Sequence, residues 1–148
     1  YPKGSEPREA LKTWHFMLGL SVFALVWIRL LARVRGGTPP IVPKPAAWQT
    51  GVGHAMHAAL YLLMICMPVA GWLILSAAGK PIPFFGLELP PLVGTDKALA
   101  EQIEEIHKTV GTIGYWLIGL HAAASLFHHY VQHDNTLMRM SLWRRSGG

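Results

Sequence analysis

Two histidines stand fourteen residues apart, at positions 107 and 121, in a long apolar stretch near the C-terminus. On an α-helix, fourteen residues advance roughly 1400°, within about 40° of four whole turns, and about 21 Å along the axis. One helix face therefore presents two imidazoles at two depths. Gly111, Gly114 and Gly119 lie between them and disfavour a helix on their own, so they indicate a bulky, flat group close to the backbone. The pattern favours two stacked b-type haems over histidines that merely pack in a core.

The composition is that of a membrane protein. Of 148 residues, 51% are hydrophobic and only 14% are charged, against about a quarter charged in soluble domains. We expect an all-α transmembrane helical bundle forming one integral membrane domain over residues 1–148. The net charge of +5 does not indicate nucleic-acid binding, because the basic residues flank apolar runs as in membrane topology. The single cysteine, Cys66, excludes a disulfide within the chain and a CxxCH haem attachment, so any haem is held non-covalently.

The apolar runs predict three helices, at about 10–34, 50–78 and 100–133. The connection 35–49 contains two glycines and four prolines, and the connection 79–99 again contains four prolines. Neither segment can continue a helix, so both are expected to be irregular loops. The second loop is long enough to cap one end of the bundle.

Charge asymmetry predicts the orientation. Basic residues gather in the first loop and in the tail: Arg33, Arg35, Lys44, Arg139, Arg144 and Arg145. Acidic residues gather in the second loop and at the start of the third helix: Glu88, Asp96, Glu101, Glu104 and Glu105. By the positive-inside rule, the first loop and the C-terminus are cytoplasmic. The first and third helices then run in the same direction, which places His15 and His107 at one level near the outer face, where one iron could take both as axial ligands.

The deeper level offers other polar residues. Arg29 follows His15 by fourteen residues, so it lies level with His121 on nearly the same helix face. A buried arginine needs an anion, and a haem propionate suits a bidentate guanidinium. An equally weighted alternative is that Arg29 snorkels to the lipid headgroups.

Four further histidines lie at the ends of the predicted helices. His54 and His57, three residues apart, could contact propionates, could supply a ligand to the deeper iron, or could be interfacial residues without a special role. Of His128 and His129, one could hydrogen-bond a quinone carbonyl, because such a site needs a donor beside an apolar slot.

Several segments resemble one known family: KTWHFMLGL, GHAMHAALYLL, IHKTVGTIGYWLIGLHAAASLFHHY and DNTLMRM. Over about residues 11–140 the chain resembles the prokaryotic cytochrome b561 family. That resemblance implies a four-helix bundle of the bacterial inner membrane with two b haems, one near each face. It implies electron transfer from a periplasmic donor to the quinone pool. One branch of the family is similar to superoxide oxidase, which takes an electron from superoxide and reduces ubiquinone.

The resemblance also assigns residues. It implies that His15 and His107 ligate the outer haem, that His121 ligates the inner haem, and that His128 lies beside the quinone site. The family's second inner ligand comes from a first helix, for which this sequence has no counterpart. We therefore expect an N-terminal helix to be missing from the sequence. Otherwise His54, His57 or a neighbouring chain must supply that ligand, or only one haem is bound.

Two functions from different classes fit these observations. The first is a superoxide:ubiquinone oxidoreductase-like enzyme, for which no catalytic side chain is assigned. The second is a membrane anchor and electron relay for a larger quinone-linked dehydrogenase or hydrogenase, with a partner subunit or a second copy beside it. A haem-free metal transporter is disfavoured, because the spans offer only Cys66 besides histidines, and metal paths usually recruit carboxylates or thiolates.

Overall fold

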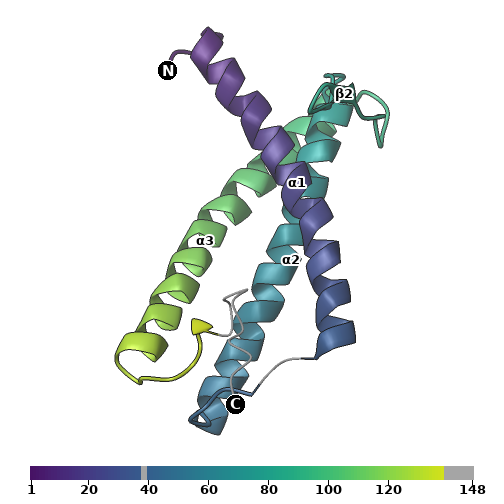
Figure 1. Ribbon diagram of the computed structural model, residues 1–148. Coiled ribbons are helices and arrows are strands. Elements are labelled where there is room, and N and C mark those ends of the chain that lie inside the picture. Colours follow the sequence, from purple (N-terminus) through teal and green to yellow (C-terminus); the bar gives the residue numbers. More distant parts are fainter. Residues whose placement is uncertain (38–39, 139–148) are drawn as a thin grey trace.

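Three long helices dominate the computed structural model, which describes residues 1–37 and 40–138. They are α1 (Glu6–Gly36), α2 (Ala47–Ala77) and α3 (Lys97–Tyr130) (Figure 1). Each is long and apolar enough to cross a membrane, so the prediction of an all-α transmembrane bundle is confirmed. The helices begin three or four residues before the predicted positions. The predicted basic tail residues Arg139, Arg144 and Arg145 lie outside the described residues.

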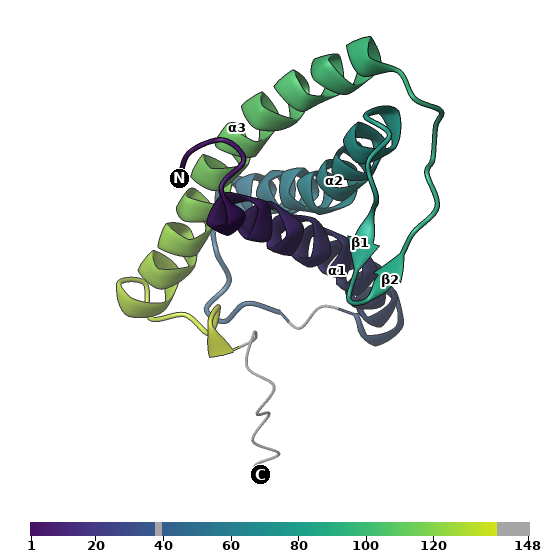
Figure 2. The ribbon, with the colours of Figure 1, turned by 90° about the horizontal axis from the view of Figure 1, so that it is seen from above.

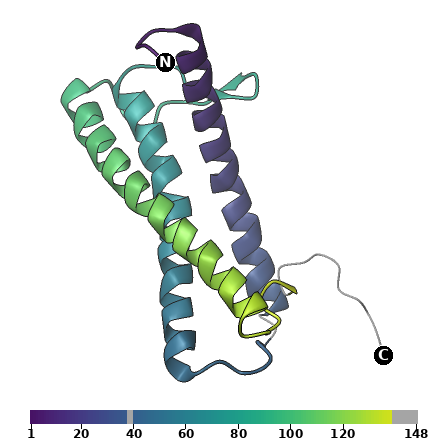
Figure 3. The same ribbon diagram turned by 90° about the vertical axis from the view of Figure 1, so that its left-hand side faces the viewer.

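Helix α2 is the central element, since both α1 and α3 pack against it. Seen from above, α1 and α3 lie on different sides of α2 (Figure 2). A side view shows the N-terminus of α1 near the second loop at one end, and the first loop near the end of α3 at the other (Figure 3). We call these the hairpin end and the tail end. Helices α1 and α3 therefore run in the same direction, and α2 runs against them.

Local signals set the helix ends. Pro7 occupies the first turn of α1, where a missing N–H costs no helical hydrogen bond. Gly37 ends α1 at a φ of 68°, a left-handed conformation that favours glycine, and its N–H donates to the Arg33 carbonyl oxygen at 3.1 Å. Asp96 caps α3, because its side chain accepts a hydrogen bond from the Leu99 N–H at 3.0 Å.

The second loop covers the hairpin end. It forms a short antiparallel hairpin from β1 (Pro83–Phe84) and β2 (Leu87–Glu88), and the hairpin packs on α1. Ile82, just before β1, is buried with Leu20 and Leu75 in the core cluster of the described chain. The loop is thus a packed cap, with a hairpin where the sequence predicted irregular structure.

Most apolar side chains of the helices point outward. Leu25, Ile28 and Leu62 are each more than 60% exposed. In water such surfaces would be costly, whereas in a bilayer they contact hydrocarbon. The chain is therefore a multi-pass membrane protein associated with lipid.

Candidate haem sites

His15 and His107 face each other across the gap between α1 and α3. Their ring centroids are 6.1 Å apart and the ring planes are at 84°. Two imidazole nitrogens on opposite sides of one metal, each at about 2 Å, would place the ring centroids roughly 6.2 Å apart. The two co-directional helices thus bring together the residues predicted to share an iron, at close to the separation that an axial pair requires.

A large apolar cavity of about 640 Å³ adjoins this pair. Its lining comes from all three helices and from Ile82. Gly19 and Gly111 both line it, and a Cβ added at Gly19 would meet nothing within 4 Å. Gly71 also lines it, and its Cβ would lie 3.7 Å from Cε1 of His107. Small residues therefore keep open a slot of the size and polarity that a porphyrin needs.

The sequence predicted one role for the three glycines of α3, but in the structure their surroundings differ. A Cβ at Gly114 would lie only 2.8 Å from Cδ2 of Leu63, so this glycine lets α2 and α3 approach closely. A Cβ at Gly119 would meet nothing within 4 Å. Gly114 thus serves helix packing as well as the cavity, whereas Gly119 leaves space deeper along α3.

The donor set at the hairpin end fits haem. Nδ1 of His107 is buried and has no hydrogen-bond partner among the described residues, which is uncommon for a buried polar atom and indicates a bound group. Within residues 1–37 and 40–138, no three His, Cys, Asp or Glu side chains are arranged to hold a metal ion. Two imidazoles suffice for haem iron, however, because the porphyrin supplies the other four nitrogens.

The deeper histidine of α3 has a neighbour on α2. The ring centroids of His57 and His121 are 5.4 Å apart, with the planes at 71°. This is shorter than the roughly 6.2 Å expected for an axial pair on one iron, so these two rings would have to separate slightly to share a metal. The sequence had offered His57 as a propionate contact, and the structure places it directly beside the proposed inner ligand.

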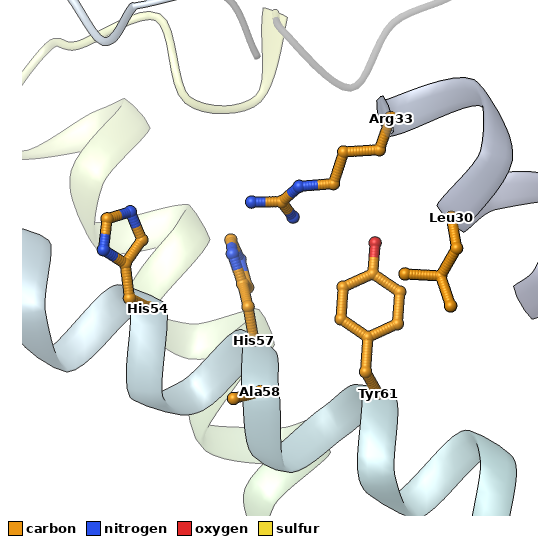
Figure 4. A pocket seen from close by; sticks show the side chains of 6 residues that line it. All are labelled: Leu30, Arg33, His54, His57, Ala58 and Tyr61. Atoms are coloured by element: carbon orange, nitrogen blue, oxygen red, sulfur yellow. The ribbon is translucent and has the colours of Figure 1, made fainter. Parts of the chain in front are cut away.

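A second cavity, of about 300 Å³, opens beside His57 at the tail end. Figure 4 shows the Arg33 guanidinium reaching from α1 into the space above His57 and Tyr61, with His54 one turn away on α2. Nε of Arg29 donates to the Tyr61 hydroxyl at 3.3 Å. The Arg33 guanidinium lies 5.9 Å from the centroid of the Tyr61 ring, a cation–π contact.

This cavity is positively charged without an internal counter-ion. Seven of the eight acidic side chains in the sequence belong to the first turns of α1, the second loop or the start of α3, at the hairpin end. Neither Arg29 nor Arg33 forms an ion pair within the described chain. The site therefore suits a carboxylate such as a haem propionate. From the sequence, Arg33 was named only as a topology signal and Tyr61 was not named at all. The spacing of Arg29 and Arg33, four residues apart on one helix face, could have placed Arg33 at the site.

The eighth carboxylate, Asp134, is held by the histidines that end α3. Oδ2 of Asp134 lies 2.8 Å from Nδ1 of His128, and its backbone oxygen lies 3.3 Å from Nδ1 of His129. Burial opposes ionisation of Asp134, but hydrogen bonds from Thr136 and His128 outweigh it and lower the pKa of the carboxyl. Asp134 was not assigned to a site from the sequence, because it lies beyond the end of α3, where helical spacing does not predict contacts.

The fold and these paired imidazoles define a class: a multi-pass membrane haem protein. The comparisons agree. A model of the prokaryotic cytochrome b561 family matches residues 2–142, and the chain belongs to that family. It is accordingly a membrane cytochrome of electron transport that binds haem b.

Relatives from two bacteria show the extent of the similarity. The chain is 39% identical over 140 residues to cytochrome b561 homolog 1 of Escherichia coli K12, covering 95% of this chain and 80% of the relative. It is 40% identical over 141 residues to "Probable superoxide oxidase CybB" of Yersinia pestis, covering 93% and 80%. Cytochrome b561 homolog 2 of Escherichia coli K12 is 32% identical over 127 residues, covering 85% and 68%.

Proposed function

We propose that the chain carries electrons from a periplasmic donor, through two b haems, to ubiquinone in the bacterial inner membrane. The observation that carries the proposal is the facing pair His15 and His107 at 6.1 Å beside a 640 Å³ apolar cavity. His121, about 21 Å further along α3, supplies a second level for iron. The relative named as a probable superoxide oxidase supports superoxide as the donor.

We assign a separate role in electron transfer to each of these residues. His15 and His107 would hold the outer haem, and a haem ligated by two histidines supplies one-electron transfer. His121 holds the inner haem, and Arg29 stabilises a propionate beside it. His128, two turns beyond His121 on α3, donates a hydrogen bond to the quinone.

The orientation follows from charge. We place the hairpin end in the periplasm and the first loop and C-terminus in the cytoplasm, on the positive-inside rule. At the hairpin end, Lys108 pairs with Glu104, and Lys12 with Glu9 at 2.8 Å. In each pair the two charges offset each other, so Lys80 and Lys97 remain among the cations at this end that would attract an anionic donor. Reporter fusions to the first loop and to the C-terminus check the orientation.

His57 has two candidate roles at the inner haem. It either ligates the iron opposite His121 or contacts a propionate from the cavity that it shares with Arg33. Its short ring separation from His121 supports the propionate role. The variant His57→Ala separates the two: loss of the bis-histidine spectrum of one haem assigns an axial ligand, whereas a retained spectrum with a shifted midpoint potential assigns a propionate contact.

The deciding experiment is an optical spectrum of the purified protein with haem quantification, followed by a superoxide-driven quinone-reduction assay. We expect two b haems per chain and rapid ubiquinone reduction. One haem per chain would limit the proposed electron transfer to a haem at His15 and His107. A protein without haem would overturn the proposal. Two haems without superoxide-driven reduction, together with a copurifying periplasmic subunit, would support the electron-relay subunit of a larger dehydrogenase or hydrogenase.

A further inference from the structure

The buried carboxylate at the tail end has no part in holding haem. Asp134 is 6% exposed, although it lies in the segment that follows the last turn of α3. A buried charge is costly unless it is fully hydrogen-bonded. Its two oxygens are occupied: Oδ1 accepts from the Thr136 N–H at 2.9 Å, and Oδ2 lies 2.8 Å from Nδ1 of His128.

This contact fixes the protonation pattern of one imidazole. An ionised carboxylate can only accept hydrogen bonds, so Nδ1 of His128 must carry a proton and donate it to Asp134. Nε2 is then the nitrogen that exchanges a proton with its surroundings. The His128 side chain is 24% exposed and that of Asp134 only 3%, so the imidazole is the accessible half of the pair.

The segment that carries Asp134 is itself anchored. The Asn135 N–H donates to the Val42 carbonyl oxygen at 3.2 Å, and Oδ1 of Asn135 accepts from the Val42 N–H at 3.0 Å. These two bonds join the segment after α3 to the loop between α1 and α2. The carboxylate is therefore held in place by contacts that do not involve His128, as a preorganised partner must be.

We propose that Asp134 is the positioning residue of a proton-delivering pair, in which it holds Nδ1 of His128 protonated so that Nε2 gives its proton to the quinone oxygen during reduction. This inference rests on the proposed quinone site at His128. Ubiquinone becomes ubiquinol by taking two electrons, one from each reduced haem, and two protons. For each proton, the Nε2–H bond of His128 breaks and an O–H bond forms on the quinone. Nε2 then takes a proton from water at the tail end, while Asp134 stabilises the charged imidazolium.

The test isolates the quinone half of the reaction. Haem-loaded full-length protein in detergent is reduced with stoichiometric dithionite and mixed with a short-chain ubiquinone, and haem reoxidation is followed optically in H₂O and in D₂O. For Asp134→Asn we expect reoxidation to slow on the order of tenfold, with a larger solvent isotope effect and an unchanged haem content and spectrum. His128→Gln should slow it similarly, and the double variant should be no slower than either single one.

The matched control is Asn135→Ala, which removes the side-chain bond from the Val42 N–H but keeps the backbone bond from the Asn135 N–H to Val42. The carboxylate stays anchored, so this variant should reoxidise at the wild-type rate. Equal slowing in Asn135→Ala and Asp134→Asn would show that Asp134 only holds the segment in place, and it would overturn the inference. A wild-type rate in Asp134→Asn with a slow His128→Gln would overturn it too, while leaving quinone at His128. A wild-type rate in His128→Gln would refute the proposed quinone position itself.

Discussion

The two ends of the bundle surround their histidines with opposite chemistry. At the hairpin end, His15 and His107 adjoin an apolar cavity of about 640 Å³ lined by glycines and by Ile82 from the capping loop. At the tail end, His57 opens onto a cavity of about 300 Å³ with Arg33 and Tyr61 in its lining. A haem at the first site would be held mainly by shape and by its two ligands. A haem at the second would be held in large part by charge.

This difference has a consequence for redox chemistry. A cationic side chain favours the reduced, less positive state of a haem. The effect is weak where a haem propionate neutralises that side chain and stronger where none does. An apolar wall also favours the haem state of lower charge. The two levels can therefore be tuned separately. Substitutions at one end should therefore leave the haem at the other end unchanged.

The largest effect is expected for His107→Ala. It removes one of the two imidazoles at 6.1 Å, and the haem at the hairpin end should be lost, because one remaining histidine cannot hold it from both sides. Haem quantification should fall from two to one per chain, with the haem at His121 still visible in the spectrum. His133→Ala, at an exposed residue beyond α3, is the control and should retain both haems. Loss of both haems in His107→Ala would refute independent sites.

Next in size is the packing of α2 on α3. In Gly114→Leu, the new Cβ would lie 2.8 Å from Cδ2 of Leu63, so the Leu63 side chain must shift or the helices must separate, at a cost of about 1–3 kcal/mol for overpacking. Thermal unfolding in detergent should show a lower Tm, with haem lost first from the hairpin end. Gly51→Leu is the matched control, since a Cβ there meets nothing within 4 Å. Equal Tm values for the two variants would show that the close approach at Gly114 does not matter.

The sequence predicted the hairpin end better than the tail end, for a physical reason. The spacing of the histidines gives their depth along each helix, and the charge asymmetry of the loops gives the direction of each helix. Two co-directional helices with histidines at equal depth must place those histidines at one level, as is found for His15 and His107. The contacts of His57 depend instead on the rotation of α2 about its own axis, which periodicity leaves undetermined in a helix with apolar residues on every face. The contact between Asp134 and His128 depends on how the chain turns after α3, and no helical repeat extends there.

A smaller effect is expected for Arg29→Leu. Removing a positive charge near the inner haem disfavours its reduced state, so the midpoint potential of that haem should fall, by tens of millivolts for a charge roughly 10 Å away at an effective dielectric of about 20. A spectroelectrochemical titration measures it, and the haem at His107 should not shift. Arg35→Leu removes the same charge farther from His121 and should shift the potential less. An unchanged titration in Arg29→Leu would leave Arg29 as a lipid headgroup contact.

The smallest expected effect is a loss of folding stability at low pH. It arises from the Asp134–His128 pair and involves neither haem level. The pKa of Asp134 is lowered from its ordinary value of about 3.8, so the folded state binds this proton less readily than the unfolded chain does. The pair therefore contributes stability that is fully present above about pH 3.8 and is lost as the pH falls through the lowered folded pKa. A carboxyl-carbon NMR titration should show Asp134 titrating below 3.8 in the wild type and at higher pH in His128→Gln, which lacks the imidazole. The same titration point in both proteins would mean that Thr136 alone holds the carboxylate ionised.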